Sequence, residues 1–97
     1  MIDWPDIRSQ FPVTEDSVYL NTAAAGPLAR ATAQAGALYY EQMMNDGDVH
    51  WDEWLVRREE VRAQVARFIN AEPDENGFTI NTSSGMNLIV DALEKHG

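Results

Sequence analysis

Two long stretches of helical periodicity dominate the sequence and limit what the chain can fold into. Residues 51–69 carry apolar side chains every three or four positions, with charged side chains opposite them, which is typical of an amphipathic helix. Residues 28–45 show a similar stripe, and Pro27 fits the first turn of a helix that begins there. Residues 45–48, Asn-Asp-Gly-Asp, end this first helix, and Asn70 ends the second.

Shorter elements are expected around these two helices. Asp3 can cap a short helix that ends before Pro12, and residues 84–95 form a third long helix with an apolar stripe. The runs 18–20 and 78–80 have the composition of brief strands. The expected structure is therefore mostly helical, with one or two short strands.

Composition excludes several classes of protein. The chain has 97 residues and is 44% hydrophobic, which is too short for a large single core and too apolar for a disordered tail. Its 16 acidic and 7 basic residues give a net charge of −9, which argues against binding to nucleic acid or to an anionic membrane. There is no cysteine, no signal-like N-terminus and no apolar run near ~20 residues, so we expect a cytoplasmic protein that does not bind membranes.

The segment 51–69 also contains most of the basic residues. Arginines and glutamates alternate along it, as expected of a solvated helix face with i,i+4 ion pairs. The residues are Arg57, Arg58, Arg62, Arg67, Glu53, Glu59 and Glu60. His50 and His96 have no partner in the sequence, and we interpret both as solvated.

The segment "FTINTSSGMNLIVDAL", residues 78–93, places small and polar residues where a short apolar run meets a helix. The first N–H groups of a helix lack internal partners and lie at the positive end of its dipole, so they can bind an anion. Thr82 and Ser83 would add hydroxyl donors, and Gly85 would allow close approach of a ligand. This pattern indicates phosphate binding.

The alternative is that Thr82, Ser83 or Ser84 only caps the helix. No Gly-x-Gly-x-x-Gly or Gly-Lys-Ser/Thr motif is present.

Four segments occur in an order that resembles the N-terminal part of the class V aminotransferase family. They are "FPV", "VYLNTAAAGPL", the Trp- and Arg-bearing "WDEWLVRREEVRAQVARFINA" and "FTINTSSGMNLIVDAL". That family includes cysteine desulfurases, selenocysteine lyases, isopenicillin N epimerase-like proteins and kynureninase-like enzymes. The resemblance implies an α/β fold, the fold type I of enzymes that depend on pyridoxal 5'-phosphate.

The resemblance also assigns roles to individual residues. Thr82 and Ser83 match the pair that holds the cofactor phosphate in this family. The glutamate that usually follows is Ser84 here, while the downstream asparagine is kept as Asn87. Asn21 and Ala24 match the loop beside the substrate pocket, although close packing that needs small side chains would explain this loop equally well.

The chain's single lysine, Lys95, does not match the lysine that forms the Schiff base in this family. The family's lysine follows a histidine in the second half of a longer chain, whereas "EKHG" reverses that order. We therefore interpret Lys95 as a positive charge near the C-terminus of a helix, where it interacts favourably with the helix dipole. The chain is accordingly expected to be an N-terminal fragment with no catalytic residue of its own, inactive by itself.

The resemblance predicts the domain organisation and the partners. Residues 1–27 would form an N-terminal arm and active-site loop. Residues 28–97 would form two long helices, followed by the first strand and helix of the large cofactor-binding domain. The complete enzyme is expected to be a homodimer acting on an amino acid by transamination, desulfuration, lyase chemistry or epimerisation. A strand without neighbours should leave apolar surface exposed.

Two other functions remain open. The first is a small acidic helical module that binds a protein partner through a face with Trp51 and Trp54, without catalysis. The second is a phosphate-binding module that uses the same helix N-terminus without pyridoxal chemistry.

Overall fold

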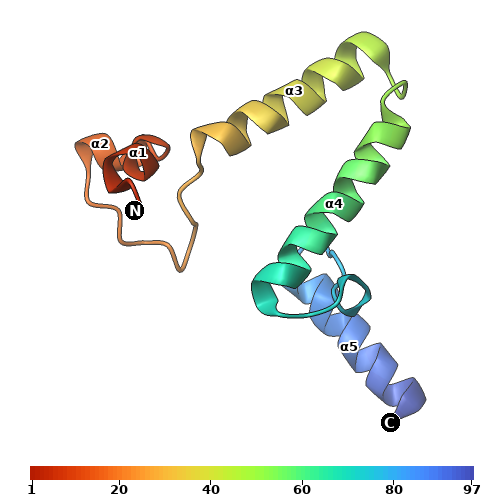
Figure 1. Ribbon diagram of the computed structural model, residues 1–97. Helices are drawn as coiled ribbons and strands as arrows, with labels where there is room; N and C mark the ends of the chain where they lie inside the picture. Colours follow the sequence, from red (N-terminus) through yellow and green to blue (C-terminus); the bar gives the residue numbers. More distant parts are fainter. The chain divides into compact units, whose positions relative to one another are not determined.

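The computed structural model describes residues 1–97 and divides them into two compact units, Met1–His50 and Trp51–Gly97 (Figure 1). The first unit contains α1 (Trp4–Ser9), α2 (Val13–Asp16) and α3 (Arg30–Asp46). The second contains α4 (Trp51–Ile69), the 3₁₀ helix η1 (Pro73–Glu75) and α5 (Thr82–His96). The expectation of a mostly helical chain is confirmed, and α4 has the bounds predicted from its periodicity.

The N-terminal helix forms as its capping residue predicts. The Asp3 side chain accepts a hydrogen bond from the Asp6 amide at 3.1 Å, and Pro5 lies in the first turn, where its missing N–H costs nothing. The following short helix α2 was not expected. The Thr14 hydroxyl donates to the Phe11 carbonyl at 2.9 Å and satisfies an acceptor at its start.

Helix α3 begins at Arg30, later than the position that Pro27 indicated. The Arg30 amide donates to the Gln10 carbonyl at 2.8 Å, and its guanidinium donates to the Ser9 carbonyl at 3.0 Å. The same guanidinium forms an ion pair with Glu15 at 3.0 Å. The start of α3 is therefore tied to the N-terminal arm by partners about 15–20 positions earlier in the sequence, and local helix signals do not contain that information.

Both long helices end at a residue with positive φ. Gly47, at φ +64°, follows α3, and Asn70, at φ +56°, follows α4. After α4, the Asn70 amide donates to the Arg67 carbonyl at 3.4 Å and the Ala71 amide to the Ala66 carbonyl at 2.9 Å. These two bonds form a Schellman motif, which satisfies carbonyls at the helix end. The predicted stops are confirmed.

The expectation of short strands is wrong, because the structure contains no β-strand. Residues 18–20 and 78–80 are irregular. A strand needs a neighbour to pair with its N–H and C=O groups, and neither segment has one among these 97 residues.

The two units have almost no buried core. Ala66 is the buried hydrophobic residue, at 1% exposure. The apolar stripe of α5 is about half exposed, at Met86, Ile89, Val90 and Leu93. The expected exposure of apolar surface is confirmed. No helix is both long and apolar enough to cross a membrane.

Candidate anion-binding site at the start of helix α5

The first turn of α5 is capped by Asn81. Its side-chain oxygen accepts from the Ser84 amide at 2.8 Å, and its main-chain carbonyl accepts from the Gly85 amide at 3.2 Å. The capping alternative therefore named the wrong residues, since neither Thr82 nor Ser83 nor Ser84 supplies the cap. Asn81 has an extended backbone, with φ −164° and ψ 172°, as an N-cap residue requires.

Capping by Asn81 leaves the hydroxyl groups of Thr82 and Ser83 without a hydrogen-bond partner in the protein. Both residues are exposed in the first turn, and their main-chain amides are also unpaired. The first turn of α5 contains no acidic residue, whereas that of α4 contains Asp52 and Glu53. In a chain of net charge −9, this turn therefore offers hydrogen-bond donors without a repelling carboxylate.

Thr79 lies directly beside this turn. Its hydroxyl donates to the Asn81 carbonyl at 3.1 Å, and a Cβ added to Gly85 would lie 3.3 Å from its oxygen. Gly85 thus permits the close approach of Thr79. The contact holds the segment before α5 against the first turn of the helix.

A second set of contacts holds the preceding loop against α4. Arg62 Nη1 donates to the Asn76 carbonyl, while Asn76 Nδ2 donates to the Arg62 carbonyl at 3.5 Å and to the Pro73 carbonyl at 3.1 Å. Arg62 Cζ lies 5.1 Å from the centroid of the Phe78 ring, within the range of a cation–π contact. Figure 1 shows this loop folding back beside the second half of α4 before α5 begins.

Three ion pairs of α4 join residues one or three positions apart, not four. Glu59 accepts from Arg62 at 2.9 Å and from Arg58 at 3.0 Å, and Arg57 pairs with Glu60 at 2.9 Å. The hydrogen bond from Arg62, followed by that from Arg58, lowers the pKa of the Glu59 carboxyl below its ordinary value. Arg62 therefore has partners on its own helix and on the following loop.

Asn21 and Ala24, the residues expected beside the substrate, lie in a turn of the first unit. The amides of Ala24 and Ala25 both donate to the Asn21 carbonyl at 3.1 Å, and the Tyr19 hydroxyl donates to the Ala25 carbonyl. Both expected residues are exposed. The turn belongs to a different unit from Thr82 and Ser83.

Lys95 lies in the last turn of α5, where its ammonium pairs with Asp91 at 2.7 Å. It follows Thr82 by 13 residues, which at ~1.5 Å per residue places it about 20 Å along the helix from the first turn. That separation exceeds the reach of a lysine side chain. The interpretation of Lys95 as a C-terminal helix charge is confirmed.

Neither histidine belongs to this turn. His50 Nε2 lies 2.9 Å from Asp46 Oδ2, so the expectation that His50 has no partner is wrong. Asp46 lies four positions before His50, so this pairing could have been predicted from the sequence. His96 lies in the last turn of α5, where a histidine is favourable to the helix dipole when it is protonated.

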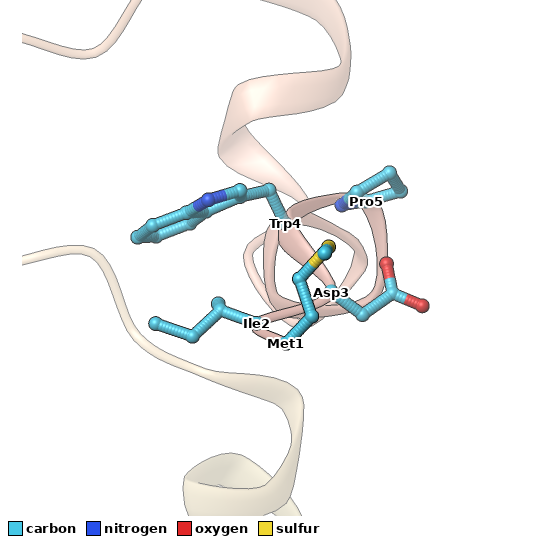
Figure 2. Close-up of a pocket in the computed structure, with 5 residues that line it drawn as sticks. All are labelled: Met1, Ile2, Asp3, Trp4 and Pro5. Atoms are coloured by element: carbon cyan, nitrogen blue, oxygen red, sulfur yellow. The ribbon is translucent and has the colours of Figure 1, made fainter.

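An open hollow of about 410 Å³ lies at the N-terminus. Figure 2 shows Ile2 and Trp4 pointing to one side of this segment, and Asp3 and Pro5 to the other. Met1 completes the lining. The lining is mostly apolar, and its one carboxylate belongs to Asp3, which caps α1. We assign no chemistry to this hollow.

Known proteins resemble this chain over most of its length. The family model described as aminotransferase class-V matches residues 18–96. A "Probable cysteine desulfurase" of Methanothermobacter thermautotrophicus is 35% identical over 94 residues, covering 91% of this chain and 23% of that protein. A protein of the same description from Pyrococcus abyssi is 33% identical, covering 92% of this chain and 23% of its own. The "Uncharacterized aminotransferase YcbU" of Bacillus subtilis is 27% identical, covering 93% and 24%.

The chain spans about a quarter of the length of the curated relatives it matches. No solved structure matches it significantly. The family match includes α3, α4 and α5, and therefore the turn that contains Thr82 and Ser83. The family is one of generally pyridoxal-phosphate-dependent enzymes with fold type I. Since the model covers well over half of the sequence, the chain belongs to the class V aminotransferase family.

Proposed function

We propose that these 97 residues are the N-terminal portion of a pyridoxal-phosphate-dependent enzyme that acts on an amino acid. In this enzyme, the first turn of α5 supplies part of the site for the cofactor phosphate. Thr82 and Ser83 bind the phosphate oxygens through their hydroxyl and main-chain N–H groups. No residue of this chain is assigned a catalytic role.

The main support for the proposal is that Asn81 is the residue that caps α5. A helix that used Thr82 or Ser83 as its cap would already have engaged one of the two hydroxyls, but the hydrogen bond from the Ser84 amide to Asn81 Oδ1 leaves both available. The donor set therefore fits a phosphate: two hydroxyls, two free amides, the positive end of a 15-residue helix and no acid in the first turn. The serine at position 84 in place of the family's glutamate removes no donor from this set.

The residues of this chain bind and orient the cofactor and the substrate. The cofactor, when bound, supplies the electron sink that stabilises carbanions during amino-acid reactions. Thr82 and Ser83 hold one end of the cofactor, and Asn81 caps the helix to which they belong. Asn21 and Ala24 border the substrate. The lysine that anchors the cofactor lies outside these residues under this proposal, because Lys95 is paired with Asp91 at the far end of α5.

The names of the relatives favour one reaction among those compatible with the family. Two of the three relatives described are named as cysteine desulfurases and one as an aminotransferase. L-Cysteine is therefore the first substrate to test, and sulfur release the first reaction to measure. Since this chain has no cysteine, a thiol that accepts sulfur would belong to another part of the enzyme.

The remaining structural expectations belong to the same proposal. Residues 1–27 act as an arm and active-site loop, and residues 28–97 open the large domain. The complete enzyme is a homodimer in the cytoplasm. The exposed apolar stripe of α5 supports an incomplete domain, because such a stripe is normally buried against other elements.

The test uses the complete enzyme, meaning the longer protein or a chimera in which residues 1–97 replace the matching quarter of the Methanothermobacter relative. Replacing Thr82 and Ser83 together by Ala removes two hydroxyl donors to a charged group, each worth about 1.5–3 kcal/mol. Even partial loss should weaken cofactor binding by roughly tenfold or more. Binding should not vanish, because the main-chain amides remain.

Two matched variants identify the cause of any loss. Ser84→Ala removes a neighbouring hydroxyl that has no assigned role, and should leave cofactor dissociation unchanged. Asn81→Ala removes the cap, and should lower stability by about 1 kcal/mol with little change in dissociation. If the double Ala variant melts earlier but releases cofactor at the wild-type rate, Thr82 and Ser83 do not hold the phosphate.

The non-catalytic alternative makes a different prediction. A small interaction module built on the face of Trp51 and Trp54, whose rings lie 6.5 Å apart, would be a stable monomer with a cooperative melting transition. The near absence of buried apolar residues predicts the opposite for the isolated chain. A phosphate-binding module without pyridoxal chemistry would bind inorganic phosphate and the cofactor equally well.

A further inference from the structure

We propose that Arg62 is a positioning residue for the cofactor phosphate site. It acts at a distance, by fixing the loop that leads into α5. The inference rests on the proposed role of Thr82 and Ser83, since it states what holds their turn in place.

A reciprocal pair of hydrogen bonds joins α4 to the loop that leads into α5. Arg62 donates from its guanidinium to the Asn76 carbonyl, and the Asn76 side-chain amide donates back to the Arg62 carbonyl at 3.5 Å. We call this pair the Arg62–Asn76 bracket. The Asn76 amide also donates to the Pro73 carbonyl at 3.1 Å, so both sides of the loop turn are fixed by one side chain. Asn76 Oδ1 is buried without a partner, so the side chain acts here through its two N–H groups.

The second step is the contact between Arg62 and Phe78. The guanidinium carbon lies 5.1 Å from the ring centroid, where the charge is attracted to the face of the ring. Phe78 is 48% exposed, so the ring is only partly covered by the protein. Arg62 therefore fixes the loop at two positions, Asn76 and Phe78.

The third step joins the fixed loop to the first turn of α5. Thr79 follows Phe78 directly, donates to the Asn81 carbonyl at 3.1 Å and packs beside Gly85. The same main-chain carbonyl accepts from the Gly85 amide in the first turn of α5 at 3.2 Å. A continuous set of contacts thus leads from α4 to the turn in which Thr82 and Ser83 lie.

The exposure of Arg62 distinguishes it from the other arginines of α4. Its side chain is 23% exposed, against 76% for Arg57 and 56% for Arg58. Arg58 shares Glu59 with Arg62 at 3.0 Å, yet it makes no hydrogen bond to the loop. Arg58 therefore offers a matched control with the same charge, the same helix and the same carboxylate partner.

The first measurement is amide hydrogen exchange of Ser84 and Gly85, whose amides both donate to Asn81, in the complete enzyme without cofactor. Arg62→Ala should raise exchange there by about tenfold, because it removes hydrogen bonds from a charged donor. Arg58→Ala should leave exchange of these residues at the wild-type rate. Arg62→Lys keeps a charge near Phe78 but loses the planar fork, so its exchange should lie between those of wild type and Arg62→Ala. Unchanged exchange in Arg62→Ala, or full rescue by Lys, overturns the inference.

The second measurement separates positioning from general stability. Arg62→Ala should accelerate cofactor dissociation by about tenfold in the wild-type background. In the Thr82→Ala/Ser83→Ala background its further effect should be clearly smaller, because only the main-chain amides of the turn remain to be positioned. An additive effect overturns the positioning role. If the Thr82→Ala/Ser83→Ala pair leaves dissociation unchanged while Arg62→Ala still raises exchange, the proposed phosphate role fails but the Arg62–Asn76 bracket stands.

Discussion

Replacing Asn81 by Asp separates the two tasks of the α5 N-terminus, which are to cap a helix and to bind an anion. Aspartate has the same shape and keeps the acceptor that receives the Ser84 amide at 2.8 Å. Asn and Asp are about equally good N-cap residues. The substitution therefore keeps the cap and adds one negative charge beside Thr82 and Ser83.

The added charge acts in opposite directions on stability and on cofactor binding. At a helix N-terminus it should stabilise the enzyme without cofactor by about 0.3–1 kcal/mol, and the first turn of α5 has no other acid to oppose it. Groups on one helical turn are about 6 Å apart, so Coulomb repulsion in water is about 0.7 kcal/mol per unit charge. A phosphate group carries about two negative charges, which gives about 1.4 kcal/mol, or roughly tenfold weaker binding. A lower effective dielectric would increase this effect.

The assay measures thermal melting of the cofactor-free enzyme and the rate of cofactor release, for wild type, Asn81→Asp and Asn81→Ala. We expect Asn81→Asp to melt at or above the wild-type temperature and to release the cofactor about ten times faster. Asn81→Ala should do the reverse, with a lower melting temperature and nearly unchanged release. Raising the salt concentration should reduce the difference in release between wild type and Asn81→Asp, because surface charges are screened.

One result would refute this reasoning directly. If Asn81→Asp releases the cofactor at the wild-type rate at low salt, no phosphate lies at the first turn of α5. A lower melting temperature for Asn81→Asp would show instead that the cap itself depends on the amide group, and the stability estimate would be wrong.

Two further predictions concern α4. Glu59→Gln should destabilise the complete enzyme at neutral pH, because Arg62 and Arg58 hold the pKa of Glu59 below its ordinary value near 4.5. Because the pKa of Glu59 is lower in the folded enzyme than in the unfolded chain, its ion pairs stabilise the fold at pH values above the unfolded pKa. This stabilisation is lost as the pH falls through the folded pKa. The difference in melting temperature should therefore shrink as the pH falls below about 4.5, and a constant difference would contradict this. Asn70→Gly should be neutral or slightly stabilising, whereas Asn70→Val should cost about 1–2 kcal/mol because of the positive φ; equal melting of the two variants would contradict the left-handed cap.

Local chemistry determined most of the helical content. The apolar spacing of residues 51–69 predicted α4 with its observed bounds, because a periodic stripe is a property of the sequence alone. Asp3 predicted the first helix and Asn70 the end of the second long one, since both act through groups within a few residues. The family resemblance and the pair Thr82 and Ser83 were also visible in the sequence. The roles of this pair remain predictions.

Contacts between distant residues decided what the sequence did not show. Pro27 indicated an early start for α3, but hydrogen bonds from Arg30 to Ser9 and Gln10 accompany a start at Arg30. The runs 18–20 and 78–80 have strand-like composition, yet a strand exists only when a neighbour satisfies its backbone, and none does so here.

The same distinction applies to the candidate site. Thr82, Ser83 or Ser84 was the expected cap of α5, whereas in the folded chain Asn81 accepts from the Ser84 amide. Arg62 was indistinguishable in sequence from the other arginines of its helix. Its contacts with Asn76 and Phe78 join residues that are 14 and 16 positions apart. Helix periodicity fixes which face a side chain occupies, but only the folded chain determines what lies opposite that face.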